Sequence, residues 1–367
     1  MKVVQVAHYY GPLGGIERVV YQFCQGLKGL YSVEALACNT SIKTVRTEEE
    51  GIPVTRVGRI AHFQRMSVSP SFPLHLRRMK PDLVHVHMTN PLAEVSCLFS
   101  GLKCPVIATY HMDVTRQRVL NSLYAPLQRM FLERTRLITV SSANFARTSP
   151  VLSNWMEKVR VLPFGISQKA SLPTERTSEM LKKLRESFPG KVVLFVGRLI
   201  HYKGIEVLVD AMRSVQATCL IIGGGYLEQE IKKQIQQHHQ ENKIFLVGRV
   251  SDEELIAYYQ RADVFVLPSV NRTEAYGLTQ IEAMAQGTPV ICTDVGTGTS
   301  FVNEDGVSGL VIQPGDSSAL ADALNHILRD EELRSKLSAG ARHRAETLFT
   351  EEYMVMNLRN IYKEILR

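Results

Sequence analysis

The sequence predicts an α/β fold built from two doubly wound domains, each a parallel sheet with helices on both faces. Two observations support this prediction. Short apolar runs rich in β-branched residues alternate with longer stretches of helical periodicity, which is the pattern of strand–helix–strand crossovers. The alternation also starts afresh near residue 190, and 367 residues, 45% hydrophobic and 22% charged, are enough for two globular domains.

The first half of the chain opens with a strand, a glycine turn and a helix. The apolar run KVVQVAH (2–8) meets the glycines of GPLGG (11–15), and GIERVVYQFCQGL (15–27) has the periodicity of a helix. Further strands are expected at 82–87, 105–111 and 137–142, with helical stretches between them.

The second half repeats this logic. Strands are expected at 190–199, 217–225, 243–248, 263–269 and 288–293, and the last of these is expected to close the sheet. Helices are expected at 204–214, 226–239 and 251–262, at a stretch that starts around 274–278, and from 317 to the end of the chain. Ser251 followed by Glu254 predicts a capping box at the start of the helix at 251–262.

A domain boundary is expected near VLPFGISQKASLPTERTSEM (161–180), which contains two prolines and several small polar residues. We therefore expect a first domain at 1–165, a second at 166–350, and a final helix at 351–367 that packs back against the first domain.

The net charge of +7 is unevenly distributed. Residues 1–165 contain 20 Lys and Arg against 10 Asp and Glu, whereas residues 166–367 contain 23 against 26. A basic half favours an anionic partner, such as an acidic lipid surface or a diphosphate-bearing acceptor, although a merely solubilising surface explains it equally well. Nucleic acid is the least favoured partner, because no helix-turn-helix, zinc or aromatic RNA-binding pattern accompanies the charge.

Composition also bears on the compartment. No run approaches the roughly 18 apolar residues of a spanning helix, and the first residues lack the apolar core and cleavage site of a secretory signal. The six cysteines are scattered without a C-x-x-C pair, which indicates reduced thiols in a cytoplasmic protein.

Two acidic residues, Glu274 and Glu282, stand eight positions apart around the start of an apolar helix. Glu274 is expected in the turn before that helix, and Glu282 about two turns into it. A carboxylate accepts two parallel hydrogen bonds from vicinal hydroxyls, so two such groups suit a ligand with two diols, as in a sugar nucleotide. The alternative is structural, with Glu274 as a helix cap and Glu282 in solvent.

Two cations, Arg198 and Lys203, straddle the next junction of strand and helix, in VGRLIHYKG (196–204). Two positive charges beside a helix start suit a diphosphate. Because the chain has no D-x-D triplet, these side chains would have to neutralise the diphosphate themselves. A surface pair without a ligand is the alternative.

The glycine turn after the first strand is a weaker signal. Gly14 and Gly15 would let backbone N–H groups approach a phosphate or an acceptor. The turn is not G-x-G-x-x-G, which argues against a nicotinamide site, and a simple tight turn explains it as well.

The histidines separate by position. His85 and His87 alternate along one strand, so we expect both on one face, in the core or behind a site. His111 closes the strand at 105–111, which suits chemistry, although a structural role is the alternative. We expect His238 and His239 in solvent. We find neither metal-ligand spacing nor a G-x-S-x-G elbow.

Taken together, these segments resemble the retaining glycosyltransferases of glycosyltransferase family 4, which have the GT-B fold. The matching segments are GPLGG, ATYHMD (108–113), VGRLIHYKG and, above all, PSVNRTEAYGLTQIEAMAQGTPVI (268–291). The resemblance covers nearly the whole chain. It implies two Rossmann-like domains that face each other across a cleft, with the acceptor on the first and the nucleotide sugar on the second.

The resemblance also implies roles for individual residues. Glu274 would hold donor-sugar hydroxyls, Glu282 the ribose diol, and Arg198 with Lys203 the diphosphate. The helix start at Tyr276, Gly277 and Leu278 would add backbone N–H groups, and Gly248 to Val250 would face the base. His111 would lie near the reacting sugar carbon, and Gly14 and Gly15 near the donor phosphates or the acceptor. The asparagine usual before the linker glycine is Phe164 here, which weakens any role transferred to this position.

The reaction that the resemblance implies is metal-independent, retaining glycosyl transfer with no cofactor. Its donor would be GDP-mannose, or second a UDP-hexose. Its acceptor would be a glycan, or a glycan on a lipid diphosphate, in O-antigen and lipopolysaccharide synthesis at the inner face of the cell membrane. A sugar-nucleotide epimerase or hydrolase of GT-B shape, or a non-catalytic sugar-nucleotide-binding protein, are the alternatives.

Overall fold

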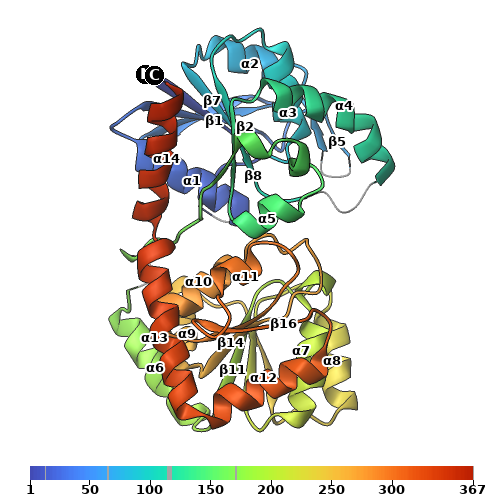
Figure 1. Ribbon diagram of the computed structural model, residues 1–367, viewed down its shortest axis with the longest axis vertical. Coiled ribbons are helices and arrows are strands. Elements are labelled where there is room, and N and C mark those ends of the chain that lie inside the picture. Colours follow the sequence, from blue (N-terminus) through green and yellow to red (C-terminus); the bar gives the residue numbers. More distant parts are fainter. Residues whose placement is uncertain (13, 64–65, 114–117, 170–171, 367) are drawn as a thin grey trace. The chain divides into compact units, whose positions relative to one another are not determined.

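The computed structural model describes residues 1–12, 14–63, 66–113, 118–169 and 172–366, and it divides the chain into two compact units. The N-terminal unit comprises Met1–Phe164 with Glu351–Arg367, and the C-terminal unit comprises Gly165–Thr350. Each unit has one main sheet with helices on both faces (Figure 1). The predicted fold class is confirmed, because both units are Rossmann-like and their main sheets are almost entirely parallel.

The main sheet of the N-terminal unit has the order β10-β9-β8-β7-β1-β2-β4-β3. Its strands are β1 (Lys2–Val6), β2 (Ser32–Cys38), β3 (Val45–Glu49), β4 (Ile52–Val57), β7 (Leu83–Met88), β8 (Val106–Tyr110), β9 (Leu137–Val140) and β10 (Val159–Val161). All pairs are parallel except β3 with β4. A separate antiparallel hairpin joins β5 (Ala61–Phe63) and β6 (Met66–Val68).

Helices cover both faces of this sheet. One face carries α2 (Phe72–Arg78), α3 (Pro91–Phe99), α4 (Arg118–Arg134) and α5 (Ala143–Thr148), and its apolar core contains strand residues such as Val86 and Tyr110. The other face carries α1 (Gly15–Leu27) and the last helix, α14 (Glu351–Ile365), which contact each other. Because side chains alternate along a strand, the residues between those of the apolar core point toward α1 and α14. Several of them are polar, as described below.

The C-terminal unit has an all-parallel sheet with the order β13-β12-β11-β14-β15-β16. Its strands are β11 (Val192–Val196), β12 (Thr218–Ile222), β13 (Ile244–Gly248), β14 (Val264–Leu267), β15 (Val290–Thr293) and β16 (Gly309–Ile312). The prediction that 288–293 closes the sheet is wrong, because β16 pairs with β15 and forms the edge.

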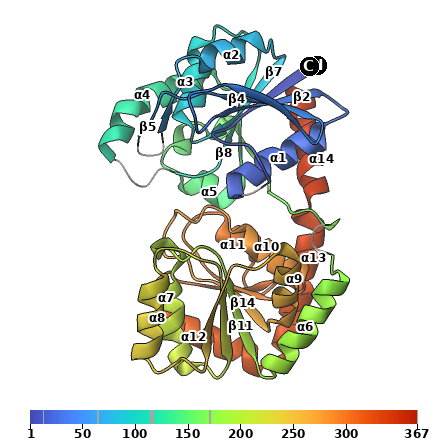
Figure 2. The same cartoon turned by 180° about the vertical axis from the view of Figure 1, so that it is seen from behind.

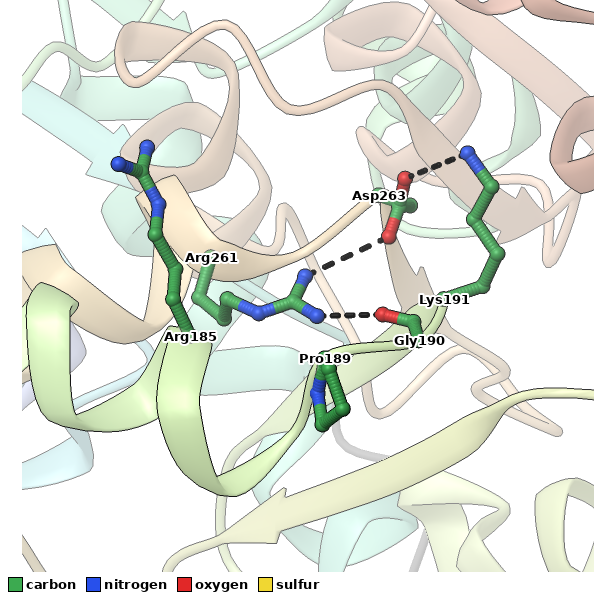
Figure 3. A pocket seen from close by; sticks show the side chains of 6 residues that line it. All are labelled: Arg185, Pro189, Gly190, Lys191, Arg261 and Asp263. Carbon is green, nitrogen blue, oxygen red and sulfur yellow. Dashed lines mark hydrogen bonds and ion pairs between the residues drawn. The ribbon is translucent and has the colours of Figure 1, made fainter.

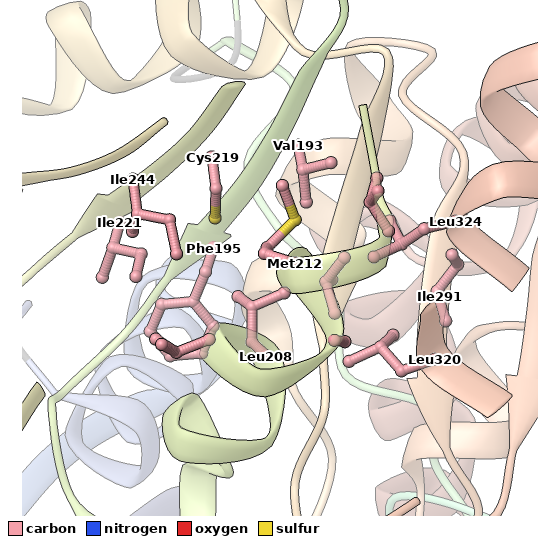
Figure 4. Close-up of a cluster of buried hydrophobic side chains, with 14 of the residues drawn as sticks. Val193, Phe195, Leu208, Met212, Cys219, Ile221, Ile244, Ile291, Leu320 and Leu324 are labelled. Carbon is pink, nitrogen blue, oxygen red and sulfur yellow. The ribbon is translucent and has the colours of Figure 1, made fainter. Parts of the chain in front are cut away.

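The helices of this unit fall into two groups, which Figures 1 and 2 show on opposite sides of the sheet. They are α6 (Glu175–Ser187), α7 (Ile205–Ala211), α8 (Glu228–Gln237), α9 (Asp252–Arg261), α10 (Leu278–Ala285), α11 (Thr299–Val302), α12 (Ser317–Arg329) and α13 (Glu331–Leu348). Helices α7, α8 and α12 bury an apolar core against the sheet, in which Phe195, Leu208 and Leu324 have no exposed surface (Figure 4). The predicted capping box is confirmed at α9, where Ser251 and Glu254 bond reciprocally.

All six cysteines are unpaired, and all but Cys104 are buried. Within the described ranges, no helix combines the length and the apolar character needed to cross a membrane.

Candidate functional site

The candidate site of the C-terminal unit lies where the strand order reverses. The chain passes from β11 outward through β12 and β13, then returns to β14 on the other side of β11. The loops after β11 and β14 therefore leave the sheet as neighbours, at the carboxyl ends of the strands. Open α/β sheets bind ligands at such switch points.

Glycines allow the loops to approach each other closely here. Gly204 adopts φ 68 before α7, and a Cβ at this position would lie 2.0 Å from the carbonyl oxygen of Pro268. A Cβ on Gly223, after β12, would lie 1.9 Å from the carbonyl oxygen of Gly197. Larger residues would push these loops apart, so the glycines fix the site's backbone.

An ion pair joins the two loops. Lys203 ends a 3₁₀ turn after β11, and its Nζ lies 2.5 Å from Oε2 of Glu274 in the loop after β14. Only 10% and 9% of the two side chains are exposed. Ser269 Oγ donates to the same Glu274 oxygen at 3.2 Å. Oε1 of Glu274 makes no hydrogen bond with any described residue.

Arg198 stands beside this pair but is exposed. Its Nη2 donates to the Tyr202 hydroxyl at 3.1 Å, and it forms no ion pair with the residues that the structure describes. Lys203 Nζ lies 5.6 Å from the centre of the Tyr202 ring. Tyr202 therefore contacts both predicted phosphate-binding cations, a role that sequence reasoning did not assign to it.

Helix α10 begins at the end of the loop that contains Glu274. Gly277 caps it at φ 81, and Leu278 is its first residue, so the N–H groups of the first turn point out of the N-terminal end of the helix. Tyr276 and Gly277 are buried. Glu282 lies about one turn into α10, not two, and its Oε2 accepts from the Tyr259 hydroxyl at 2.9 Å. Glu282 is thus oriented by α9 rather than simply solvated.

The loop after β15 supports the Glu274 segment through residues that sequence reasoning missed. Thr297 Oγ1 donates to the Glu274 carbonyl at 2.6 Å, and the Gly298 N–H donates to the Ala275 carbonyl at 2.8 Å. A Cβ on Gly298 would lie 2.4 Å from Tyr276 Cδ2. The only sequence signal for these contacts was the small-residue run VGTGTS.

Gly248 and Val250 lie farther along the sheet. Gly248 ends β13 with φ 83, and its carbonyl accepts from the Gly223 N–H at 2.8 Å. Since β12 separates β13 from β11, these two residues stand two strands away from Arg198 and Lys203. They share the carboxyl edge of the sheet with the ion pair without touching it.

In the N-terminal unit, the predicted glycines lie at the start of α1. Gly14 is its N-cap at φ 96 and Gly15 its first residue, while Leu13 lies outside the described residues. A Cβ on Gly14 would lie 2.4 Å from Glu17 Oε2. The positive φ disfavours any other residue at this position, whereas the end of the flexible Glu17 side chain can move aside.

His111 follows β8 and is buried. Its Nε2 lies 2.9 Å from Nδ1 of His87, and its ring centre lies 5.4 Å from that of Phe164. Burial lowers the pKa of His111 to about 3. The expectation that His85 and His87 share one face is confirmed, since their rings stack at 4.9 Å and both are buried.

His8 follows β1 in a cationic neighbourhood. Its Nε2 lies 3.4 Å from Ser67 Oγ, to which Arg59 Nη1 donates at 3.3 Å. Burial, with the nearby His62 and Arg59, lowers the pKa of His8 to about 4.

The expectation that His238 lies in solvent is wrong, because its Nε2 lies 2.9 Å from Asp210 Oδ1 and its side chain is only 22% exposed. His239 is exposed, as expected.

A hollow of the C-terminal unit lies at the opposite ends of the same strands, where Lys191 precedes β11 and Asp263 precedes β14 (Figure 3). Asp263 is already paired there with Lys191 at 3.2 Å and with Arg261 at 3.6 Å. Asp263 is therefore held by structural ion pairs with its neighbours. In the part of the chain that the structure describes, no group of three or more His, Cys, Asp or Glu side chains is placed to hold a metal ion.

The fold places the molecule in a known structural class. Sucrose-phosphate synthase from Thermosynechococcus elongatus superposes with a TM-score of 0.81 at 22% identity, over 100% of this chain and 99% of that one. HepE from Anabaena, solved in complex with UDP, superposes with a TM-score of 0.79 at 17% identity, over 99% and 100%. The fold is therefore that of the GT-B glycosyltransferases.

The chain belongs to the group 1 glycosyl transferases. The model of that family matches residues 177–344, and that of the glycosyl transferase 4-like domain matches residues 14–165. "O-antigen chain mannosyltransferase C" from Escherichia coli is 33% identical over 100% of this chain and 99% of its own length. "D-rhamnosyltransferase WbpZ" from Pseudomonas aeruginosa is 31% identical over 95% and 92%. The resemblance inferred from the sequence motifs is confirmed.

Proposed function

We propose that the protein transfers a hexose, with retention of configuration, from a nucleotide diphosphate sugar to a glycan or lipid-linked glycan. The observation that carries the proposal is the joining of Lys203 and Glu274 at the switch point of the C-terminal unit, with Arg198 exposed beside them. This arrangement supplies cations for a leaving diphosphate and a carboxylate for sugar hydroxyls.

In the proposed reaction, the acceptor hydroxyl attacks the anomeric carbon on the face from which the diphosphate leaves. The new bond joins the acceptor oxygen to that carbon, the bond from carbon to phosphate oxygen breaks, and a phosphate oxygen takes the acceptor's proton. Lys203 and Arg198 stabilise the charge that grows on the diphosphate, so their contribution rises toward the transition state. No divalent ion is assigned a part in this scheme.

GDP-mannose is the first proposed donor and a UDP-hexose the second. The mannosyl name of the Escherichia coli relative supports the first, and the UDP complex of HepE supports the second. A thermal-shift screen of GDP- and UDP-sugars tests this choice, because a ligand at 100 times its Kd stabilises the folded protein by ~2.7 kcal/mol.

Turnover assays test the reaction itself. With the preferred donor, we expect transfer to a glycan acceptor to continue in EDTA and the product to keep the donor's anomeric configuration by NMR. An inverted product, or activity that EDTA abolishes and Mg²⁺ restores, contradicts the proposed mechanism. Nucleotide release at the same rate without any acceptor would instead identify a hydrolase.

We further propose peripheral attachment at the cytoplasmic face of an anionic membrane, through the N-terminal unit. Helices α2, α3 and α4 are neighbours that expose large apolar side chains, namely Leu74, Phe99, Leu123 and Met130. Exposed basic residues stand among them on α2, after α3 and on α4, namely Arg77, Arg78, Lys103 and Arg129. Apolar side chains together with cations suit an interfacial contact with acidic lipids.

Vesicle flotation tests the attachment. We expect tighter binding to vesicles of acidic lipid than to neutral ones, and weaker binding of Leu123→Glu together with Arg77→Glu. Val307→Glu, which alters an exposed apolar residue of the C-terminal unit, is the matched control. Equal binding to both kinds of vesicle contradicts the proposal.

A further inference from the structure

A continuous row of buried hydrogen bonds crosses the α1/α14 face of the N-terminal sheet, with His111 at one end of it. It begins at His111 Nε2, which lies 2.9 Å from His87 Nδ1, and His87 Nε2 lies 3.0 Å from Gln5 Oε1. Gln5 Nε2 donates to the Tyr362 hydroxyl at 2.7 Å, which lies 2.6 Å from His85 Nδ1. Helix α14 thus places the Tyr362 hydroxyl against the two central strands β1 and β7.

Beyond Tyr362 the row continues to the backbone. His85 Nε2 lies 2.7 Å from Thr109 Oγ1, Thr109 Oγ1 lies 2.7 Å from Thr139 Oγ1, and Thr139 donates to the Ala108 carbonyl at 3.5 Å. A carbonyl oxygen only accepts, so this end gives the row a direction. Thr139 donates to Ala108, Thr109 to Thr139, and His85 Nε2–H to Thr109.

Each histidine in the row is neutral and so has one ring proton. Burial lowers the pKa of His85 and His111 to about 3, and burial with the neighbouring imidazoles lowers the pKa of His87 well below 6.5. With its proton on Nε2, His85 accepts from the Tyr362 hydroxyl at Nδ1. The Tyr362 oxygen then accepts from the Gln5 amide, as its orientation already shows.

The same logic fixes the other two imidazoles. Gln5 Oε1 can only accept, so His87 carries its proton on Nε2 and must accept at Nδ1. His111 Nε2 is then the donor, which leaves a lone pair on His111 Nδ1. Among the described residues, nothing forms a hydrogen bond with that atom.

We propose that His87, Gln5 and Tyr362 are positioning residues that hold His111 in the neutral Nε2–H tautomer, with Nδ1 as an acceptor for a substrate hydroxyl. The substrate part of this inference rests on the proposed glycosyl transfer. An acceptor-only imidazole selects a ligand group that donates, such as a sugar hydroxyl. It also places no positive charge beside a carbon that becomes positive as the diphosphate leaves.

Nitrogen NMR of ¹⁵N-histidine-labelled protein tests the tautomer directly and needs no activity. We expect the ring proton of His111 on Nε2 in the unaltered protein. In Tyr362→Phe, which frees the Gln5 amide to turn, we expect a mixture of tautomers or a proton on Nδ1. Tyr31→Phe is the matched control, because its ring packs on Tyr362 at 5.8 Å without joining the row. A proton on Nδ1 of His111 in the unaltered protein overturns the proposal.

Kinetics separate positioning from mere support of the fold. For Tyr362→Phe and Gln5→Leu we expect kcat to fall about tenfold or more, as when a partner behind a functional histidine is lost, with a smaller change in KM. If both variants keep the Nε2–H tautomer and the full kcat, the proposal is wrong. If the tautomer shifts in Tyr362→Phe but the unaltered protein transfers no sugar, the row is as proposed and the proposed function fails instead.

Discussion

At the scale of single residues, Arg198 and Lys203 differ in what their loss should do. We expect Arg198→Ala to lower kcat/KM about 10²–10³-fold, the cost of one preorganised contact to transition-state charge, with an unchanged melting temperature because Arg198 is exposed. Kinetics with the preferred donor and thermal unfolding of the same preparation check this. Near-normal turnover in this variant contradicts its proposed role.

Lys203→Ala should lose both activity and stability. Sequence reasoning offered a surface position as the alternative for Lys203, but Lys203 is the partner of a buried carboxylate, Glu274. Removing one member of a buried ion pair costs about 3–5 kcal/mol, because the other charge remains unpaired. The double variant Lys203→Met with Glu274→Gln serves as the control. It should recover much of the unfolding free energy in denaturant melts and none of the activity.

The sequence predicted the residue types of this site but not their contacts. Glu274 and Lys203 were each assigned to a ligand, since spacing gives no information about which loops meet across a parallel sheet. Tyr259, which binds Glu282, lies on another helix, and Thr297 supports Glu274 from a third loop. Such partners depend on strand order, which no local pattern contains.

At the scale of elements, α14 should contribute strongly to the stability of the N-terminal unit. Leu358 is fully buried on it, and a Cβ on Gly26 of α1 would lie 2.3 Å from Val355, so the two helices pack closely. We expect Leu358→Ala to lower the free energy of unfolding by about 2–5 kcal/mol in denaturant melts. Met356→Ala, at an exposed position of the same helix, should change it by less than about 0.5 kcal/mol.

The elements that sequence reasoning found are those with strong apolar runs. Strands β11 and β14 are buried on both faces and are continuous apolar segments, VVLFV and VFVL. Strands β7 and β8 are equally buried, but His85, His87 and Thr109 interrupt their apolar residues. The antiparallel β3, VRTEE, is an almost fully exposed edge strand and reads as a polar loop. Edge strands can carry little apolar signal because they need little burial. Strand β16, GLVI, is apolar but has only four residues, so its pattern is short.

At the scale of the whole molecule, acid should destabilise the N-terminal unit well before carboxylates titrate. Five histidines have a pKa below the ordinary 6.5, mainly through burial, namely His8, His75, His85, His87 and His111. Above pH 6.5 both folded and unfolded forms are neutral there. As the pH falls from 6.5 toward 4, the unfolded form takes up protons that the folded form does not, so stability declines.

Each such histidine adds a slope of about 1.4 kcal/mol per pH unit within that window. Glu94 and Glu351, whose pKa burial raises, act in the opposite direction. Urea melts between pH 7 and 5 should therefore show a falling unfolding free energy. His85→Asn should flatten the slope, and His343→Asn, at an exposed site, should not. A pH-independent stability across this range contradicts the prediction.

The N-terminal unit is discontinuous in sequence, and this has a consequence for biosynthesis. During translation, residues 165–350 emerge before Tyr362 does, so the C-terminal unit can fold while the earlier-made unit still lacks a helix. Domains usually mature in the order of their synthesis. Here we expect the C-terminal unit to be complete before the N-terminal unit. Until Tyr362 is made, the row of buried hydrogen bonds that includes His111 is incomplete. We therefore expect the unfinished chain to be unable to transfer a sugar.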